Sequence, residues 1–135
     1  MNWVIQIYVK FPVNKFFIDL TAVKAIKDEV YNIPSFCTVA AGEVCAFYED
    51  TRSWTNVKCW AWDSNMNYTG GSWPGQDCTL VGTNGDHNVW KWTYTGPATT
   101  QPTQIIFSSG STQTADLTFQ NGVYFLDGVK KGVVK

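Results

Sequence analysis

The chain has 135 residues, the size of one ordinary domain, and its 10 lysines and arginines nearly balance 11 aspartates and glutamates. That balance excludes the basic field that attracts the phosphates of nucleic acids. No apolar run reaches the roughly 18 to 20 residues that are needed to cross a bilayer, so neither nucleic acid nor a membrane is an expected partner. Seven tryptophans stand out in the composition, and each needs a packing or a binding reason.

The first forty residues differ in character from the rest of the chain. Residues 3–11 fit a strand, and Asp19 is a candidate cap for a short helix over residues 21–30. We therefore predict an N-terminal extension of unknown role over residues 1–40, followed by one domain over residues 41–135. No basic region precedes a clean apolar stretch at the start, so no signal peptide is predicted.

Short strand patterns separated by turn residues make up the remainder. We predict seven strands, over residues 43–48, 57–62, 79–81, 89–94, 104–108, 117–119 and 123–126. Residues 49–53 are polar and indicate a turn, and His87 lies in a second turn, where we expect it to be solvated. This pattern predicts an all-β fold, namely an antiparallel β-sandwich of the immunoglobulin-like or jelly-roll-like kind, with the N-terminal extension outside it.

The strand over residues 57–62 is unusual in where it places its indoles. Successive side chains of a strand point to opposite faces, which separates Val57, Cys59 and Ala61 from Lys58, Trp60 and Trp62. The small apolar set suits a core under a second sheet, so the two tryptophans are predicted to point away from it. Large apolar side chains outside a core need an explanation. The alternative is that the faces are reversed and both indoles are buried.

A loop after this strand offers a third indole. Trp73 precedes Pro74 and Gly75, and a proline favours extended geometry in the residue before it. Trp73 can therefore stand at a fixed angle beside Trp60 and Trp62 and complete a curved platform. Sugars have apolar C–H faces and hydroxyl rims, so aromatic planes with nearby hydrogen-bonding groups suit them. The cluster predicts a sugar-binding face.

The remaining large aromatics are assigned to the core. Trp54 precedes the aromatic strand and is interpreted as buried packing. Trp90, Trp92 and Tyr94 alternate with smaller side chains and so share one face of a strand. Three large aromatics on one face favour a core position over a second sugar site.

The cysteine pattern argues against a metal site. Cys37, Cys45, Cys59 and Cys78 contain no C-x-x-C pair, and His87 is the single histidine, so neither a metal nor a cofactor is predicted. Cys45 and Cys59 occupy inward positions of strand patterns, where a free thiol packs as a small apolar group. Buried free thiols are the favoured interpretation, and disulfides are the alternative.

Catalysis is not predicted. Glycosidase chemistry needs two carboxyl groups at a defined separation, and no pattern holds Asp63, Asp77 and Asp86 in such a pair. An amylase barrel also typically needs about 250 residues, more than this chain contains.

Several segments together resemble a known family. They lie within residues 43–127 and comprise Ala46-Phe47-Tyr48, Ser53-Trp54, Val57 to Trp62, Trp73-Pro74-Gly75, Ile105-Ile106-Phe107, Gln113 to Thr118 and Asn121 to Tyr124. In this order they resemble the starch-binding carbohydrate-binding modules of family 26, which are appendages of bacterial amylases. The Trp-Pro-Gly and Gln-Thr-Ala-Asp-Leu segments are the most specific.

The resemblance implies a site and a ligand. It implies that starch or maltooligosaccharides rest on Trp60, Trp62 and Trp73, and that Lys58 and Gln113 make polar contacts. It also implies a non-catalytic module that targets an attached or partner amylase, a glycoside hydrolase, to its polymer. We further expect a monomer that works outside the cell or at its surface.

The sequence departs from the family pattern at two places. Lys58 stands where the family commonly has an aromatic, and Ser108-Ser109 replaces a more usual Asn-Asp pair. Two other functions stay open. A protein-interaction sandwich would turn its exposed tryptophans toward a partner chain, and a catalytic fragment would release reducing sugar from starch.

Overall fold

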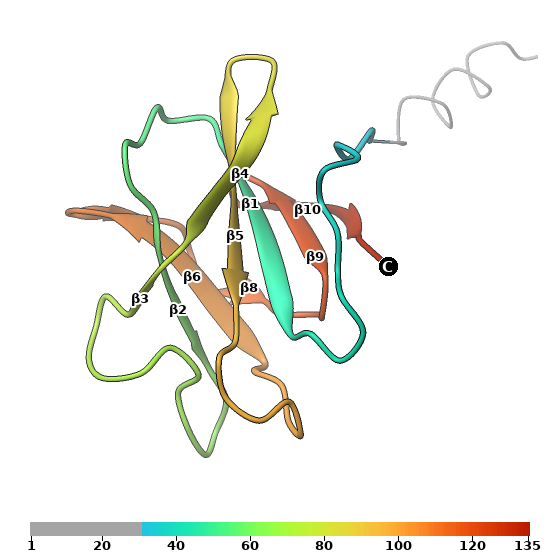
Figure 1. Cartoon of the computed structure of the whole chain (residues 1–135). Coiled ribbons are helices and arrows are strands. Elements are labelled where there is room, and N and C mark those ends of the chain that lie inside the picture. The colour runs from blue at the N-terminus through green and yellow to red at the C-terminus, as the bar shows by residue number, and fades with distance from the viewer. Residues whose placement is uncertain (1–30) are drawn as a thin grey trace, which may run out of the picture. The chain divides into compact units, whose positions relative to one another are not determined.

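The computed structural model describes residues 31–135, which contain strands and no helix (Figure 1). The strand and the helix expected within residues 3–30 lie outside the described residues. Ile33–Lys135 form one compact unit, and its first strand begins at Cys45. The boundary expected at residue 40 stays a prediction.

Ten strands in the described residues form two five-stranded sheets. Sheet A contains, in spatial order, β10 (Val129–Val133), β9 (Val123–Leu126), β1 (Cys45–Asp50), β5 (His87–Thr93) and β4 (Thr79–Asn84). Sheet B contains β3 (Gln76–Asp77), β2 (Lys58–Trp62), β6 (Gln104–Ser109) and β7 (Thr112–Gln113), and β8 (Leu117–Thr118) also pairs with β6. The predicted all-β sandwich is confirmed. Its strand pairs are antiparallel except for β1 with β9, which is parallel.

Three strands are absent from the sequence-based expectation, each for a physical reason. β3 and β7 have two residues each, too few to show a period of two. β10 has the sequence Val-Lys-Lys-Gly-Val, whose polar centre hides the alternation, and it pairs with β9 through an irregularity between Lys130 and Gly132. Tertiary pairing rather than local pattern creates these strands.

An aromatic core fills the space between the sheets. Tyr48 of β1 stacks on Phe107 of β6, with ring centroids 4.7 Å apart and planes inclined by 19°. Trp92 of β5 is fully buried, and its Nε1 donates to Oε1 of Gln76 in the opposite sheet at 2.9 Å. The predicted core positions are confirmed, because Trp54, Trp90 and Trp92 are buried and Tyr94 packs partly buried against the same cluster.

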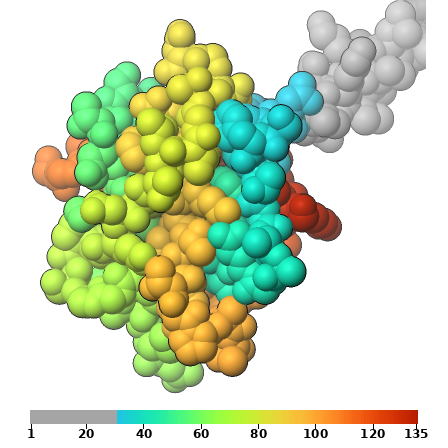
Figure 2. Space-filling model, in the orientation of Figure 1, coloured from blue at the N-terminus to red at the C-terminus, as the bar shows by residue number. Residues whose placement is uncertain are grey.

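Part of the other side of sheet A is also buried, because residues 33–44 pass across it without forming a strand. We call these residues the cover segment. The ammonium of Lys91 in β5 donates to the carbonyl oxygen of Thr38 at 2.8 Å, and a Cβ at Gly82 in β4 would touch the ring of Phe36. Figure 2 shows the segment, in cyan to teal, closing over this side of the sheet. Beneath it lies a set of buried side chains that we call the covered face: Cys45, Phe47, Glu49, Val89 and Tyr124.

The covered face contains a carboxylate that sequence analysis placed in a turn. Glu49 is 1% exposed, because β1 continues through it. Its Oε1 accepts hydrogen bonds from the Tyr124 hydroxyl at 2.6 Å and from Asn84 Nδ2 at 3.2 Å. His87 places Nδ1 2.7 Å from Glu49 Oε2, and its side chain is 40% exposed, so His87 is solvated as expected but also pairs with a buried carboxylate. A buried carboxylate requires such partners, and they lie far from it in the sequence.

The turn expected over residues 49–53 therefore starts later than predicted. Asp50 ends β1 and is 2% exposed. Its two carboxylate oxygens accept from the backbone N–H groups of Arg52 at 2.7 Å and Trp54 at 2.6 Å. Asp50 thus organises the turn that leads Trp54 back into the core.

All four cysteines are buried free thiols, which agrees with the favoured interpretation. Cys59 and Cys78 belong to the core between the sheets. Cys45 lies instead on the covered face, so the expectation that it points inward is correct as to burial and wrong as to the side of the sheet. Burial raises the pKa of Cys37 and of Cys45 to about 11. Burial, with the Cys78 thiol beside it, raises the pKa of Cys59 well above its usual range.

Candidate functional site

The outward side of sheet B carries the aromatic strand singled out in the sequence. In β2, Lys58, Trp60 and Trp62 are half-buried, whereas Cys59 and Ala61 between them are fully buried. The predicted assignment of faces is therefore confirmed, and the reversed alternative is wrong. We call the outward side of sheet B the open face.

Strand register arranges the open face in three rows, because residues paired across neighbouring strands share a side of the sheet. The first row contains Asp77, Lys58, Ser108 and Gln113; the second contains Trp60 and Ile106; the third contains Trp62, Gln104 and Thr118. Successive rows are two residues, or about 6 to 7 Å, apart along the strands. Aromatic rings therefore occupy the second and third rows, and polar groups stand on both sides of Trp60.

Trp60 and Trp73 meet at the centre of this face. Their ring centroids are 6.0 Å apart and their planes are inclined by 68°. Trp73 is 45% exposed. We call these two residues the indole pair. The rings meet at a steep angle, so they do not form the flat or gently curved platform that the sequence suggests.

The loop that carries Trp73 is attached to β2 on both sides of the indole. Before it, the Tyr68 N–H donates to the carbonyl oxygen of Ala61 at 2.7 Å. After it, Gly75 has a φ of 98°, and a Cβ there would overlap the carbonyl oxygen of Cys59. Glycine at position 75 thus allows an approach that a side chain would block. This close approach holds Trp73 next to Trp60.

The side chain of Lys58 points toward β3, where it pairs with Asp77. Its Nζ lies 2.9 Å from Oδ1 of Asp77, and the side chains are 37% and 68% exposed, respectively. A pair this exposed adds little to stability. The ion pair fixes the position of the Lys58 ammonium beside the indole pair. The ammonium keeps two further hydrogen-bond donors for a ligand there.

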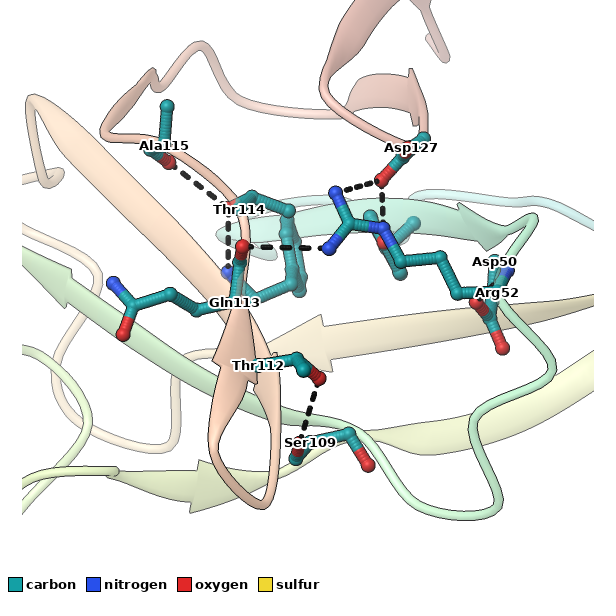
Figure 3. Close-up of polar contacts among 10 residues, drawn as sticks. Asp50, Arg52, Ser109, Thr112, Gln113, Thr114, Ala115 and Asp127 are labelled. Carbon is teal, nitrogen blue, oxygen red and sulfur yellow. Dashed lines mark hydrogen bonds and ion pairs between the residues drawn. The ribbon is translucent and has the colours of Figure 1, made fainter.

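Gln113 projects from a short strand whose backbone is fixed from several directions (Figure 3). The next residue, Thr114, is buried, and its hydroxyl accepts from the Phe107 N–H at 3.2 Å and donates to the carbonyl oxygen of Ala115 at 2.9 Å. Arg52 Nη1 lies 3.5 Å from the carbonyl oxygen of Gln113, and Nη2 lies 3.0 Å from Oδ1 of Asp127. In Figure 3 the Gln113 side chain extends away from these contacts, and its amide has no partner within residues 31–135.

The structure thus brings some of the predicted site residues together and leaves one apart. Trp60 and Trp73 are in contact, and Lys58 and Gln113 share one row beside them. Trp62 is on the same face, but among the described residues no ring packs against it. Sequence analysis missed Asp77 as the partner of Lys58, and it missed Gln104 and Thr118 altogether. Their strand alternation was visible, but alternation alone does not reveal which residues pair across strands.

Within residues 31–135, no group of three or more histidine, cysteine or acidic side chains is placed to hold a metal ion. No helix in the same residues is long and apolar enough to span a bilayer.

A β-sandwich with exposed indoles and polar side chains on one sheet face is the general arrangement of a carbohydrate-binding module. The starch-binding module 26 family matches residues 46–119, which is more than half of the chain. The chain therefore belongs to the starch-binding module 26 family, as the sequence resemblance predicts. The match runs from the second residue of β1 through β8 and thus covers the whole open face. No curated protein and no solved structure matches the chain.

Proposed function

We propose that this module binds starch and maltooligosaccharides on the open face, with the indole pair as the aromatic centre. The observation that carries the proposal is the exposure of Trp73 beside Trp60. Large apolar rings gathered at a surface generally mark a binding site. Lys58 and Gln113 supply hydrogen-bond groups beside the rings, and Trp62 adds a further ring on the same side of the sheet.

The angle within the indole pair supports an α-glucan over a β-glucan. An α-1,4-linked glucan coils, so neighbouring glucose rings are inclined to one another. A β-1,4-linked glucan is a flat ribbon and would need coplanar aromatic rings. Two indoles inclined by 68° suit neighbouring sugar rings of a coiled chain.

The expected affinity is modest. Each sugar ring that buries on the order of 100 Å² of apolar surface gains about 2.5 kcal/mol at ~25 cal/mol/Å². Costs of association reduce the sum to a dissociation constant in the micromolar to millimolar range. Such an affinity suits a non-catalytic, monomeric module that holds an attached or partner amylase on its polymer outside the cell. Several weak contacts then add through effective concentration.

Native gel electrophoresis with and without soluble starch tests this proposal. We expect starch to retard the intact protein, and we expect Trp60→Ala and Trp73→Ala each to abolish the retardation while the far-ultraviolet circular dichroism is kept. Val129→Ala is the matched control, because Val129 is also an exposed apolar residue, at 57%, but lies on β10 of sheet A. Its mobility shift should equal that of the unmodified chain.

Two results would count against the proposal in different ways. Unchanged mobility of the intact protein in starch gels would contradict glucan binding itself. Retardation that survives both tryptophan replacements would move the site away from the indole pair. Concentration-dependent sedimentation that does not respond to maltooligosaccharides would favour the protein-interaction alternative instead.

A further inference from the structure

The third row of the open face combines an aromatic ring with two polar side chains. Trp62 of β2 pairs with Gln104 of β6, and Gln104 pairs in turn with Thr118 of β8. Residues paired in this way share a side of the sheet, so all three side chains stand on the open face. Two steps between strands, at about 4.8 Å each, place Thr118 about 10 Å from Trp62 across the sheet.

Burial agrees with this placement. Trp62 and Gln104 are half-buried and Thr118 is exposed, whereas their sequence neighbours Ala61, Ile105 and Leu117 are buried. The three strands thus turn their apolar residues to the core and leave one indole, one amide and one hydroxyl outside. Ring, amide and hydroxyl are the group types that a sugar needs for its face and its rim.

The polar side chains of this row are available to form hydrogen bonds with a ligand. Within residues 31–135, the side chains of Gln104 and Thr118 make no hydrogen bond, and no ring stacks on Trp62. The backbone beneath them is fixed, since the Trp62 carbonyl oxygen accepts from the Thr103 N–H at 2.9 Å and lies 3.3 Å from the Thr103 hydroxyl. A fixed backbone with unsatisfied outward side chains binds a ligand without first breaking internal contacts.

The loop on the other side of Trp62 is also well ordered. Trp62 forms a bridge with Asn67, and Asp63 accepts hydrogen bonds from the Tyr68 hydroxyl at 2.7 Å and from the Asn65 and Met66 N–H groups at 2.8 and 2.9 Å. The Tyr68 hydroxyl and these N–H groups also lower the pKa of the Asp63 carboxyl. Trp62 therefore stands between a fixed loop and the polar pair Gln104 and Thr118.

We propose that Trp62, Gln104 and Thr118 form a second glucose subsite, which extends the glucan chain beyond the indole pair. Trp60 and Trp62 are two residues apart, so the two contacts are separated by about 6 to 7 Å along β2. One continuous oligosaccharide can span that distance and occupy both. The subsite rests on the proposed glucan binding at the indole pair and adds a preference for longer chains.

Isothermal titration with maltotriose and maltohexaose tests the subsite on the full chain. We expect the unmodified protein to bind maltohexaose about tenfold more tightly than maltotriose. Trp62→Ala should weaken maltohexaose binding more than maltotriose binding and remove that tenfold preference. The double variant Gln104→Ala, Thr118→Ala keeps the indole and should reduce the preference by about threefold. It also keeps the test decisive if Trp62→Ala does not fold. Leu80→Ala, at an exposed position of β4 in sheet A, is the matched control and should change neither affinity.

The possible results distinguish the second subsite from glucan binding at the indole pair. If the unmodified protein binds neither sugar, glucan binding itself is contradicted. If it binds both and the Trp62 and Gln104/Thr118 variants keep the preference for maltohexaose, the second subsite is wrong while glucan binding at the indole pair stands. Equal loss of both affinities in Trp62→Ala would also overturn the inference, because Trp62 would then belong to the first subsite.

Discussion

The two outward sides of the sandwich carry similar kinds of side chains in opposite environments. On sheet A, Phe47 and Tyr124 stack with centroids 6.3 Å apart, and both are fully buried. On sheet B, Trp60 and Trp73 meet at a comparable 6.0 Å, yet Trp73 is 45% exposed. Each side also holds a lysine beside its rings, Lys91 over Phe47 at 5.4 Å and Lys58 in the row next to Trp60.

The difference lies in what covers the rings. Residues 33–44 supply a cover for sheet A, and Glu43 ties that segment down through Lys91 at 3.1 Å and the Thr93 hydroxyl at 2.9 Å. On sheet B the rings instead remain at the surface. Aromatic residues on the outward side of a strand therefore have two explanations, an intramolecular cover or a ligand. The comparison shows that strand alternation identifies the residues but does not choose between the two.

The largest expected effect tests this contrast through stability. Phe47→Ala should lower the free energy of unfolding by about 3 to 5 kcal/mol, because it leaves a cavity under the cover segment. Trp73→Ala should change it by less than about 0.5 kcal/mol, as expected for an exposed side chain. Urea denaturation followed by far-ultraviolet circular dichroism measures both.

Phe47→Leu serves if Phe47→Ala does not fold, and it should still cost on the order of 1 kcal/mol. Similar losses for Phe47 and Trp73 would mean that the two sides of the sandwich are not covered and open as described.

A smaller effect concerns the loop that presents Trp73. Gly75→Ala should cost about 1 to 3 kcal/mol, since position 75 has a φ of 98° and an added Cβ would meet the Cys59 carbonyl. The loop must shift, so starch retardation in native gels should weaken markedly. Gly85→Ala is the matched control, because Gly85 also has a positive φ, of 62°, but has open space around it. That variant should lose stability and keep full retardation. Unimpaired starch binding in Gly75→Ala would show that the close approach does not position the indole.

The smallest effect appears in thiol chemistry. The thiolate is the reactive form. Burial raises the pKa of Cys37, Cys45 and Cys59, so these thiols should not react with iodoacetamide at pH 8 in the native protein. In mild denaturant we expect Cys37 and Cys45 to be alkylated before Cys59 and Cys78. The cover segment contains no strand, and such segments open at a lower free energy than a paired core does. Mass spectrometry of peptides after timed labelling gives the order. Simultaneous labelling of all four would show that the cover segment and the sandwich unfold as one unit.

Much of the fold followed from local pattern. The alternation of β2 correctly placed Cys59 and Ala61 inside and Trp60 outside, and the three aromatics of β5 and its end were correctly assigned to the core. The short strands β3 and β7 could not be predicted, because two residues have no period and exist as strands through their partners. Glu49 and Asp50 read as a polar turn for a similar reason. Their burial depends on Tyr124, Asn84 and the Trp54 backbone, and no local signal announces the two distant partners, Tyr124 and Asn84.

The sequence by itself determined the class of the fold, its family and the side of β2 on which the tryptophans stand, because these depend on short-range periodicity and on motifs in order. The tertiary structure decided which of the two aromatic outer sides is open, at what angle Trp60 and Trp73 meet, and that Gln104 and Thr118 lie in the row of Trp62. Those features depend on register between strands and on the path of residues 33–44. Both are set by contacts between residues far apart in the chain, which periodicity does not encode.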